Sequence, residues 1–144
     1  PATYAMVAAT VVLVVRLRVL GKRGVVAGLV ALGAAAVCLA LYKLIKNRTV
    51  RERPYITHSA IECASAPLDR YSFPSGHTLH AVCFTLMLTS YYPEWTSALV
   101  ALTTLIALSR VILGLHYPTD VAAGAVLGGS LGLGSLLLGQ QLIG

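Results

Sequence analysis

Five apolar runs divide the chain, and each is close to the length of a helix that crosses a membrane. A transmembrane helix needs about 20 mostly apolar residues. The runs contain few charged side chains, and basic residues gather at their ends. This pattern predicts five membrane helices, at residues 2–20, 24–45, 75–92, 96–115 and 119–143, of which the third is short for a span.

The connections between these runs differ in length. Residues 47–73 form a long polar stretch, and connections of this length are often functional. The turns at 93–94 and 115–120 are short, and aromatic residues flank the first, as is typical at the headgroup boundary of a membrane. If consecutive helices alternate in direction, the long stretch and the 115–120 turn lie at the same membrane face.

The composition also favours a membrane protein and excludes other classes. Hydrophobic residues make up 57% of the chain and charged residues 11%, whereas soluble domains carry about 25% charged residues. A chain of 144 residues cannot hide this much apolar surface in a soluble core, and the same composition excludes disorder. We therefore expect a single domain over residues 1–144, an all-α polytopic transmembrane helical bundle embedded in the lipid bilayer.

The net charge of +6 would suggest nucleic acid as the partner of a soluble protein. Here the cations flank apolar runs, so we expect contacts with lipid headgroups and no nucleic-acid partner. The segment at residues 16–23, from the end of the first run to the start of the second, carries four basic residues and no acidic one, and the positive-inside rule places it in the cytoplasm. The residues concerned are Arg16, Arg18, Lys22 and Arg23. The opposite face of the bundle is then extracytoplasmic.

Arg110 lies within the fourth apolar run, near its end. A charged side chain inside a span costs at least about 2.5 kcal/mol on insertion scales. Either the long side chain reaches the nearby interface, or it belongs to a buried anion-binding site.

The sequence Pro74-Ser75-Gly76-His77 stands at the start of the third run. The first amides of a helix are unpaired and bind anions, and glycine allows a phosphate to approach closely. His77 is placed to transfer a proton to a bound oxyanion. The alternative is that Ser75 acts only as a helix cap.

His116 and Asp120 lie four residues apart, around Pro118 at the start of the fifth run. A carboxylate that accepts a hydrogen bond from one imidazole nitrogen fixes the tautomer and leaves the other nitrogen nucleophilic. The alternative is that Asp120 or Thr119 caps the helix and His116 is an interfacial residue.

Lys46 marks the end of the second run, and Arg53 follows in the polar stretch. Together they suit a phosphate, because lysine supplies a point charge and arginine a forked pair of donors. The alternative is contact with lipid headgroups, which is what we expect of Arg48, Arg51 and Arg70.

Alternation of the helices would gather these groups at one membrane face. The set then contains a nucleophile with an orienting carboxylate, a separate acid and a cradle for an anion, which is typical of phosphoryl transfer. The sequence contains no Asp/Glu cluster suited to magnesium and no Cys/His set suited to zinc. We therefore expect neither a metal nor a cofactor.

Three motifs in this order resemble the signature of the type 2 phosphatidic acid phosphatase family, which includes membrane lipid phosphate phosphatases and is related to vanadium haloperoxidases. They are Lys46-x6-Arg53-Pro54, Pro74-Ser75-Gly76-His77 and Ser109-Arg110-x5-His116-x3-Asp120, and they delimit a core at residues 46–120. Membrane members usually have six helices. A sixth helix would precede the five that we predict, unless this chain is a shorter variant.

The resemblance implies a role for each matching residue. His116 would be the nucleophile that forms a phosphohistidine, Asp120 would orient it, and His77 would protonate the leaving oxygen. The residues that would hold the phosphate oxygens are Lys46, Arg53, Ser75, Gly76 and Arg110.

Some conspicuous residues fall outside the motifs. We expect His58 and His80 to be structural or interfacial. Gly124, Gly128 and Gly132 recur every four residues, and this spacing suits either a dimer face or packing within the bundle, of which we expect the second. The oligomeric state stays open.

These observations predict an integral membrane phosphatase, expected in a bacterial inner membrane with its site on the extracytoplasmic side. It would hydrolyse a lipid phosphate monoester or diphosphate. One alternative is a phosphatase for a soluble phosphate ester. Another is a catalytically silent lipid-binding protein, and a third is a haloperoxidase, which would need vanadate.

Overall fold

The structure is a computed structural model that describes residues 22–58 and 70–143. Its long helices are α2 (Lys22–Thr49), α4 (Gly76–Tyr91), α5 (Thr96–Ile112) and α6 (Pro118–Ile143). Two short helices, α3 (Pro54–Thr57) and the 3-10 helix η2 (Pro93–Trp95), lie in the connections. Four of the five expected helices are therefore confirmed, and the expected helix at 2–20 lies outside the described residues.

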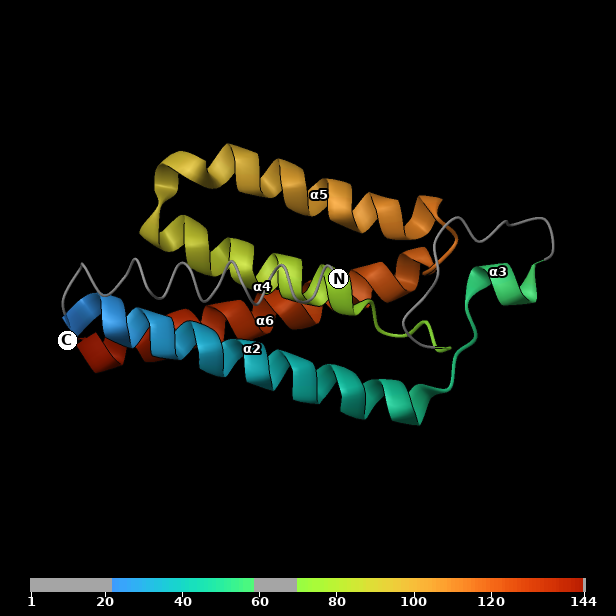
Figure 1. Cartoon of the computed structure of the whole chain (residues 1–144), viewed down its shortest axis with the longest axis horizontal. Coiled ribbons are helices and arrows are strands. Elements are labelled where there is room, and N and C mark those ends of the chain that lie inside the picture. Colours follow the sequence, from blue (N-terminus) through green and yellow to red (C-terminus); the bar gives the residue numbers. More distant parts are fainter. Residues whose placement is uncertain (1–21, 59–69, 144) are drawn as a thin grey trace.

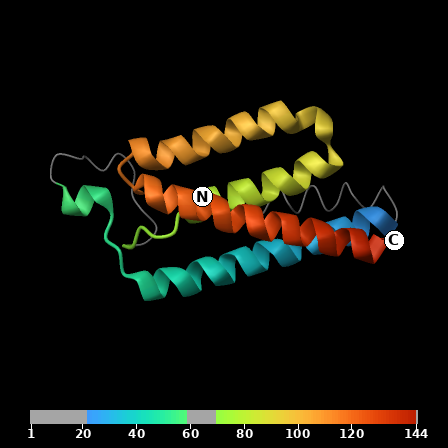
Figure 2. The same cartoon turned by 180° about the vertical axis from the view of Figure 1, so that it is seen from behind.

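The four long helices run along a common direction and alternate in sense (Figure 1). The carboxyl ends of α2 and α5 meet the amino ends of α4 and α6 at one end of the bundle, beside α3. The view from behind in Figure 2 shows the same arrangement. The 115–120 turn and the ends of the long polar stretch thus lie together, as the alternation predicts.

The interior of the bundle is built from α2, α4 and α6. Its buried side chains are small or apolar and come from α2 and α4, with leucines of α6 packed against them. The residues concerned are Val30, Ala31, Ala34, Cys38, Leu79, Cys83 and Met87. Close packing of small residues is the usual means of association between helices in lipid, where there is little hydrophobic driving force.

The glycine stripe of α6 packs against α4. A Cβ atom on Gly124 would lie 2.6 Å from the carbonyl oxygen of Ser75, and one on Gly128 would overlap the carbonyl oxygen of Leu79. A Cβ on Gly132 would lie 3.1 Å from the carbonyl oxygen of Cys83. The expectation of packing within the bundle is therefore confirmed, and this packing fixes the amino ends of both helices relative to each other.

The outer surface is strongly apolar. None of the residues of α5 is buried, and Leu105, Ile112 and Leu137 are among the large side chains that face outward. The described helices that are long and apolar enough to cross a membrane cover Val25–Thr49, Pro93–Ile112 and Pro118–Leu142. Because α4 has 16 residues, it extends only about 24 Å, in line with the short third run.

Two helix ends differ from the sequence expectation. The second helix continues to Thr49, and Val50 then turns the chain with φ 43°, an uncommon conformation for a β-branched residue. The fourth helix ends at Ile112 rather than at residue 115, because Gly114 adopts φ 66° and reverses the chain. Both turns direct polar residues across the same end of the bundle.

Candidate active site

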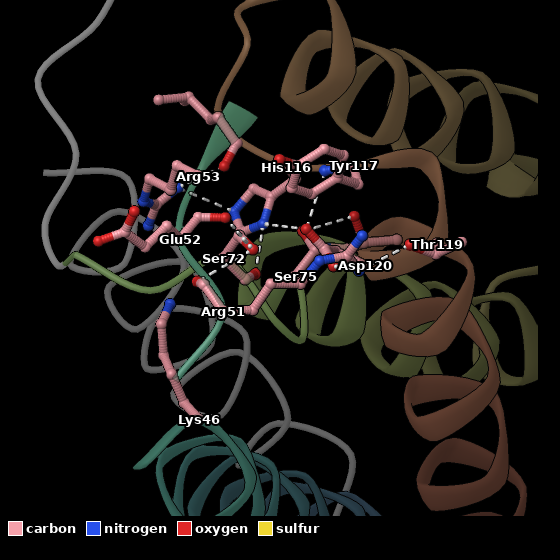
Figure 3. A network of polar contacts seen from close by, with 12 residues as sticks. Lys46, Arg51, Glu52, Arg53, Ser72, Ser75, His116, Tyr117, Thr119 and Asp120 are labelled. Carbon is pink, nitrogen blue, oxygen red and sulfur yellow. Dashed lines mark hydrogen bonds and ion pairs between the residues drawn. The ribbon is translucent and has the colours of Figure 1, made fainter. Parts of the chain in front are cut away.

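Lys46 extends from the last turns of α2 and is 5% exposed. Its ammonium group donates to the hydroxyl of Tyr42, one turn earlier, over 2.9 Å, and lies 4.7 Å from the centre of the same ring. Figure 3 shows Lys46 reaching from α2 towards the strand-like segment that carries Arg51 and Arg53. Tyr42 thus holds a largely buried cation at the site end of the bundle.

Arg53 is also buried, with 4% of its surface exposed. Its Nη1 atom donates to the carbonyl oxygen of Leu115 over 2.8 Å and lies 3.4 Å from Nε2 of His116. Pro54 begins α3, and the amide of Tyr55 bonds the carbonyl of Gly114. The segment after α2 is therefore fastened to the turn between α5 and α6.

The main chain around Gly114 positions His116. The amides of Leu115 and His116 both donate to the carbonyl of Arg110, over 3.2 and 3.0 Å, so the turn folds back on the end of α5. Because Gly114 adopts a left-handed conformation, another residue there would be strained. This turn buries the imidazole of His116 between the bundle and the Arg51–Arg53 segment.

The two imidazole nitrogens of His116 have different surroundings. Nδ1 lies 2.7 Å from the carbonyl oxygen of Ser72, which can only accept, so Nδ1 carries the hydrogen. Nε2 is then unprotonated in the neutral ring and faces Arg53. Burial lowers the pKa of His116, as do the charges of Arg53 and Lys46, whereas the nearby Asp120 carboxylate and the hydrogen bond to the Ser72 carbonyl oppose this shift. The neutral, nucleophilic form of the ring is favoured.

Asp120 is completely buried at the start of α6. One oxygen, Oδ1, accepts from Arg51 over 2.7 Å, and the other, Oδ2, accepts from the amide of Tyr117 over 2.8 Å. The second bond is the backward half of a capping box, in which a residue in the first turn pairs with the cap. Oδ2 lies 3.8 Å from Nδ1 of His116. Asp120 therefore both caps α6 and lies beside His116. The two alternatives considered for this residue, a helix cap and a partner of His116, are compatible.

The amino end of α4 lies against that of α6. The amide of Ser75 donates to the carbonyl of Asp120 over 3.0 Å, and the hydroxyl of Ser75 caps α4 by accepting from the amide of Thr78. A Cβ on Gly76 would lie 2.7 Å from the ring of Tyr42, so only glycine fits there without a shift. The positive end of the α4 dipole points to the same region as the buried cations.

His77 and Arg110 approach the site from α4 and α5. Arg110, His116 and Arg53 all act electrostatically on His77, which places the two histidines and these cations in one neighbourhood. The Nε atom of Arg110 donates to the hydroxyl of Ser109 over 3.1 Å. The structure thus brings every residue singled out in the motifs to one end of the bundle.

Arg51 corrects an expectation. It was expected to contact lipid headgroups, but its guanidinium pairs with Asp120, because the turn at Val50 directs it across the start of α6. Arg70, by contrast, pairs with Glu52 at the surface over 2.7 Å.

Ser72 was missed by the sequence analysis. It is fully buried and acts on His116 through its main-chain carbonyl, for which a sequence contains no signal.

The two remaining histidines of the described chain have local partners. Nδ1 of His80 lies 2.8 Å from the carbonyl of Gly76, and its ring stacks on Phe84. His58 contacts the hydroxyl of Thr57 and the edge of the Tyr117 ring. His80 is therefore a helix-packing residue, and His58 lies at the rim of the site.

The family comparison decides the class of protein. Residues 25–143 match the model of the PAP2 superfamily. The chain belongs to the PAP2 superfamily. The match covers the bundle and all three motifs.

Individual PAP2 relatives agree with this assignment. The chain is 38% identical over 104 residues to the decaprenylphosphoryl-5-phosphoribose phosphatase of Mycobacterium tuberculosis, covering 72% of this chain and 56% of that one. It is 32% identical over 93 residues to the lipid A 1-phosphatase of Rhizobium etli, covering 62% and 40%. The chain thus spans about half the length of these curated relatives, or less.

A solved structure also resembles this bundle. The crystal structure of a transmembrane PAP2 type phosphatidylglycerolphosphate phosphatase from Bacillus subtilis aligns with a TM-score of 0.77 and 25% identity. The alignment covers 96% of this chain and 70% of that one. The expected all-α transmembrane bundle is thereby confirmed.

Proposed function

We propose that this chain is an integral membrane phosphatase that hydrolyses a lipid phosphate monoester or diphosphate through a phosphohistidine. The proposal is supported most by the surroundings of His116. Its Nδ1–H is held by the carbonyl of Ser72, and its Nε2 faces Arg53 over 3.4 Å in a region lined by further cations. A phosphate held by these cations would present its phosphorus to an unprotonated nitrogen.

In the first step, the lone pair on Nε2 of His116 attacks phosphorus and the bond to the leaving oxygen breaks. His77, in its protonated form, gives its proton to that oxygen. The contacts with the phosphate oxygens come from Lys46, Arg53 and Arg110 and from the amino end of α4 at Ser75 and Gly76.

In the second step, a water molecule attacks the phosphohistidine, the P–N bond breaks, and His77 takes the proton from the water. Asp120 supports both steps, because its carboxylate lies 3.8 Å from Nδ1 and stabilises the positive charge that forms on the ring. Every role in this reaction sequence falls on a side chain or main-chain group of the protein, so the proposed mechanism requires no metal.

The substrate class follows from the position of the site and from the relatives. The site lies at the end of a bundle with an apolar exterior, where a lipid headgroup can arrive by lateral diffusion. The relatives are named for decaprenylphosphoryl-5-phosphoribose, lipid A and phosphatidylglycerolphosphate, all of which carry phosphate on a lipid. We propose that the substrate of the present chain is likewise a phosphate attached to a lipid.

We also propose that the site faces the extracytoplasmic side of a bacterial inner membrane. The basic segment at residues 16–23 supports this orientation, because it leads into the amino end of α2, which lies at the opposite end of the bundle from the site. A cysteine at Arg70, near the site, should react with a membrane-impermeant thiol reagent in intact cells, in a variant whose native cysteines are replaced. A cysteine at Glu94, at the other end, should react only after permeabilisation, and the reverse pattern would contradict the orientation.

The function is tested by phosphate release from a panel of lipid phosphates in mixed micelles. The matched substrates are short-chain and long-chain forms of the same ester, together with a soluble sugar phosphate. We expect release from the long-chain lipids and loss of release in His116→Ala. Equal activity on the soluble ester would favour a soluble-ester phosphatase, and no release from any substrate would favour a silent lipid-binding protein.

A further inference from the structure

Arg51 makes a set of contacts that links it to the site, although it lies outside the three motifs. Its Nη1 atom donates to Oδ1 of Asp120 over 2.7 Å and to the hydroxyl of Thr119 over 2.8 Å. Its guanidinium carbon lies 4.1 Å from the centre of the Tyr117 ring. These three partners all lie within the four residues that follow His116. Arg51 therefore binds the segment that begins α6 (Figure 3).

The main chain of Arg51 reaches His116 by a second route. The carbonyl of Arg51 accepts from the amide of Ser72 over 2.7 Å, next to the isolated bridge between Glu52 and Tyr71. The carbonyl of Ser72 in turn holds Nδ1 of His116 over 2.7 Å. Arg51 therefore supports both groups that lie beside Nδ1, the Ser72 carbonyl through its backbone and the Asp120 carboxylate through its side chain.

We propose that Arg51 is a positioning residue, which pairs with the buried Asp120 carboxylate and thereby keeps the imidazole of His116 uncharged and ready to attack. The inference rests on the proposed function of His116. Its physical basis is that an ionised carboxylate beside an imidazole favours the imidazolium, whereas a cation bound to that carboxylate weakens this effect. An imidazolium has no lone pair with which to attack phosphorus.

Several charged groups face His116 and have to be considered together. Arg53 lies at Nε2, Lys46 acts from α2, and the charges of His77 and His116 act on each other. Burial and the charges of Arg53 and Lys46 oppose protonation of His116, whereas the Asp120 carboxylate and the Ser72 carbonyl favour it. Removing the side chain of Arg51 frees Asp120 to turn towards Nδ1, so the balance shifts to the imidazolium.

The test is the protonation of His116 itself, measured by NMR in histidine-labelled protein in detergent micelles without substrate. The resonance is assigned from its absence in His116→Gln. Arg51→Gln keeps a donor for Asp120 but removes the charge, Arg51→Met removes both, and Arg51→Lys keeps the charge. Arg48→Met is the matched control, since Arg48 is an exposed arginine in the last turn of α2.

We expect the pKa of His116 to rise by about one unit in Arg51→Gln and Arg51→Met, and to stay near the wild-type value in Arg51→Lys and Arg48→Met. The acidic limb of kcat/KM against pH should move to higher pH by the same amount in the first two variants. A residue that only aids folding would lower the amount of folded protein and leave the titration unchanged.

An unchanged titration in folded Arg51→Gln overturns the inference, and so does an equal shift in Arg48→Met, which would indicate a general effect of charge. If Arg51→Met does not fold, Arg51→Gln and Arg51→Lys decide the matter by themselves. Failure of the wild type to release phosphate from any lipid would instead remove the proposed function, while the titration would still report on the link between Arg51 and His116.

Discussion

The carbonyl oxygen of Ser72 lies 2.7 Å from Nδ1 of His116, closer than the carboxylate of Asp120 at 3.8 Å. The hydrogen bond that fixes the tautomer of the ring therefore comes from the main chain. This separates two tasks that a carboxylate performs together in many catalytic triads, namely orienting the imidazole and stabilising its charge. In the proposed mechanism, the second task is left to Asp120.

Asp120→Asn tests this division of tasks. The tautomer should persist because Ser72 still holds Nδ1, but the negative charge that stabilises the imidazolium is lost. We expect kcat/KM for a lipid phosphate to fall about 10²-fold, which removes most of the activity but less than the roughly 10⁴-fold loss that a wrong tautomer causes. A loss as complete as that of His116→Ala would contradict the separation, provided that the variant is folded.

His77→Ala should distinguish substrates by their leaving groups. A general acid contributes about 10²–10⁴-fold, and most where the leaving oxygen needs a proton. A lipid alkoxide needs one and p-nitrophenolate does not, so kcat/KM should fall far more for the lipid phosphate than for p-nitrophenyl phosphate. His116→Ala should abolish both activities. Equal losses for the two substrates in His77→Ala would leave His77 as a phosphate-binding residue only.

Chelation and a phosphate analogue test the metal-independent mechanism. Among residues 22–58 and 70–143, no group of three or more His, Cys, Asp or Glu side chains is placed to hold a metal ion. We expect activity to survive EDTA and to be inhibited by vanadate, whose five-coordinate form resembles the transition state. Loss of activity with EDTA that magnesium restores would refute this mechanism.

The contact between α4 and α6 predicts different outcomes for two glycines of the same helix. A Cβ on Gly128 would overlap the carbonyl of Leu79, whereas nothing lies within 4 Å of a Cβ on Gly134. Gly128→Ala should destabilise the protein by about 1–3 kcal/mol, as overpacking does, and lower its melting temperature in detergent. Gly134→Ala should leave the melting temperature unchanged or raise it slightly. Equal melting temperatures for the two variants would show that the helices are not in contact at Gly128.

The helices could be predicted from the sequence because apolar runs of this length leave few alternatives. Alternation of four such helices was enough to bring Lys46, Arg53 and His116 to one end of the bundle. The ends of helices were less predictable, since the left-handed turns at Val50 and Gly114 depend on the surrounding structure.

The partners of the site residues were the least predictable part. The motifs identify His116 and Asp120, but the ion pair between Arg51 and Asp120 depends on how residues 50–53 cross the bundle. The role of Ser72 rests on a carbonyl group, which every residue has. Such contacts follow from tertiary structure and leave no pattern in the sequence.

The measurement that tests the account most directly is the identity of the phosphorylated residue. Protein mixed with a radiolabelled lipid phosphate is quenched in alkali within the first turnover, digested, and analysed for labelled peptides. The account predicts an alkali-stable, acid-labile label on His116. The label should not form in His116→Ala, and it should be lost from the wild type when unlabelled substrate is added in excess. A label on another residue, or one that persists in folded His116→Ala, would contradict the assignment of His116 as the nucleophile.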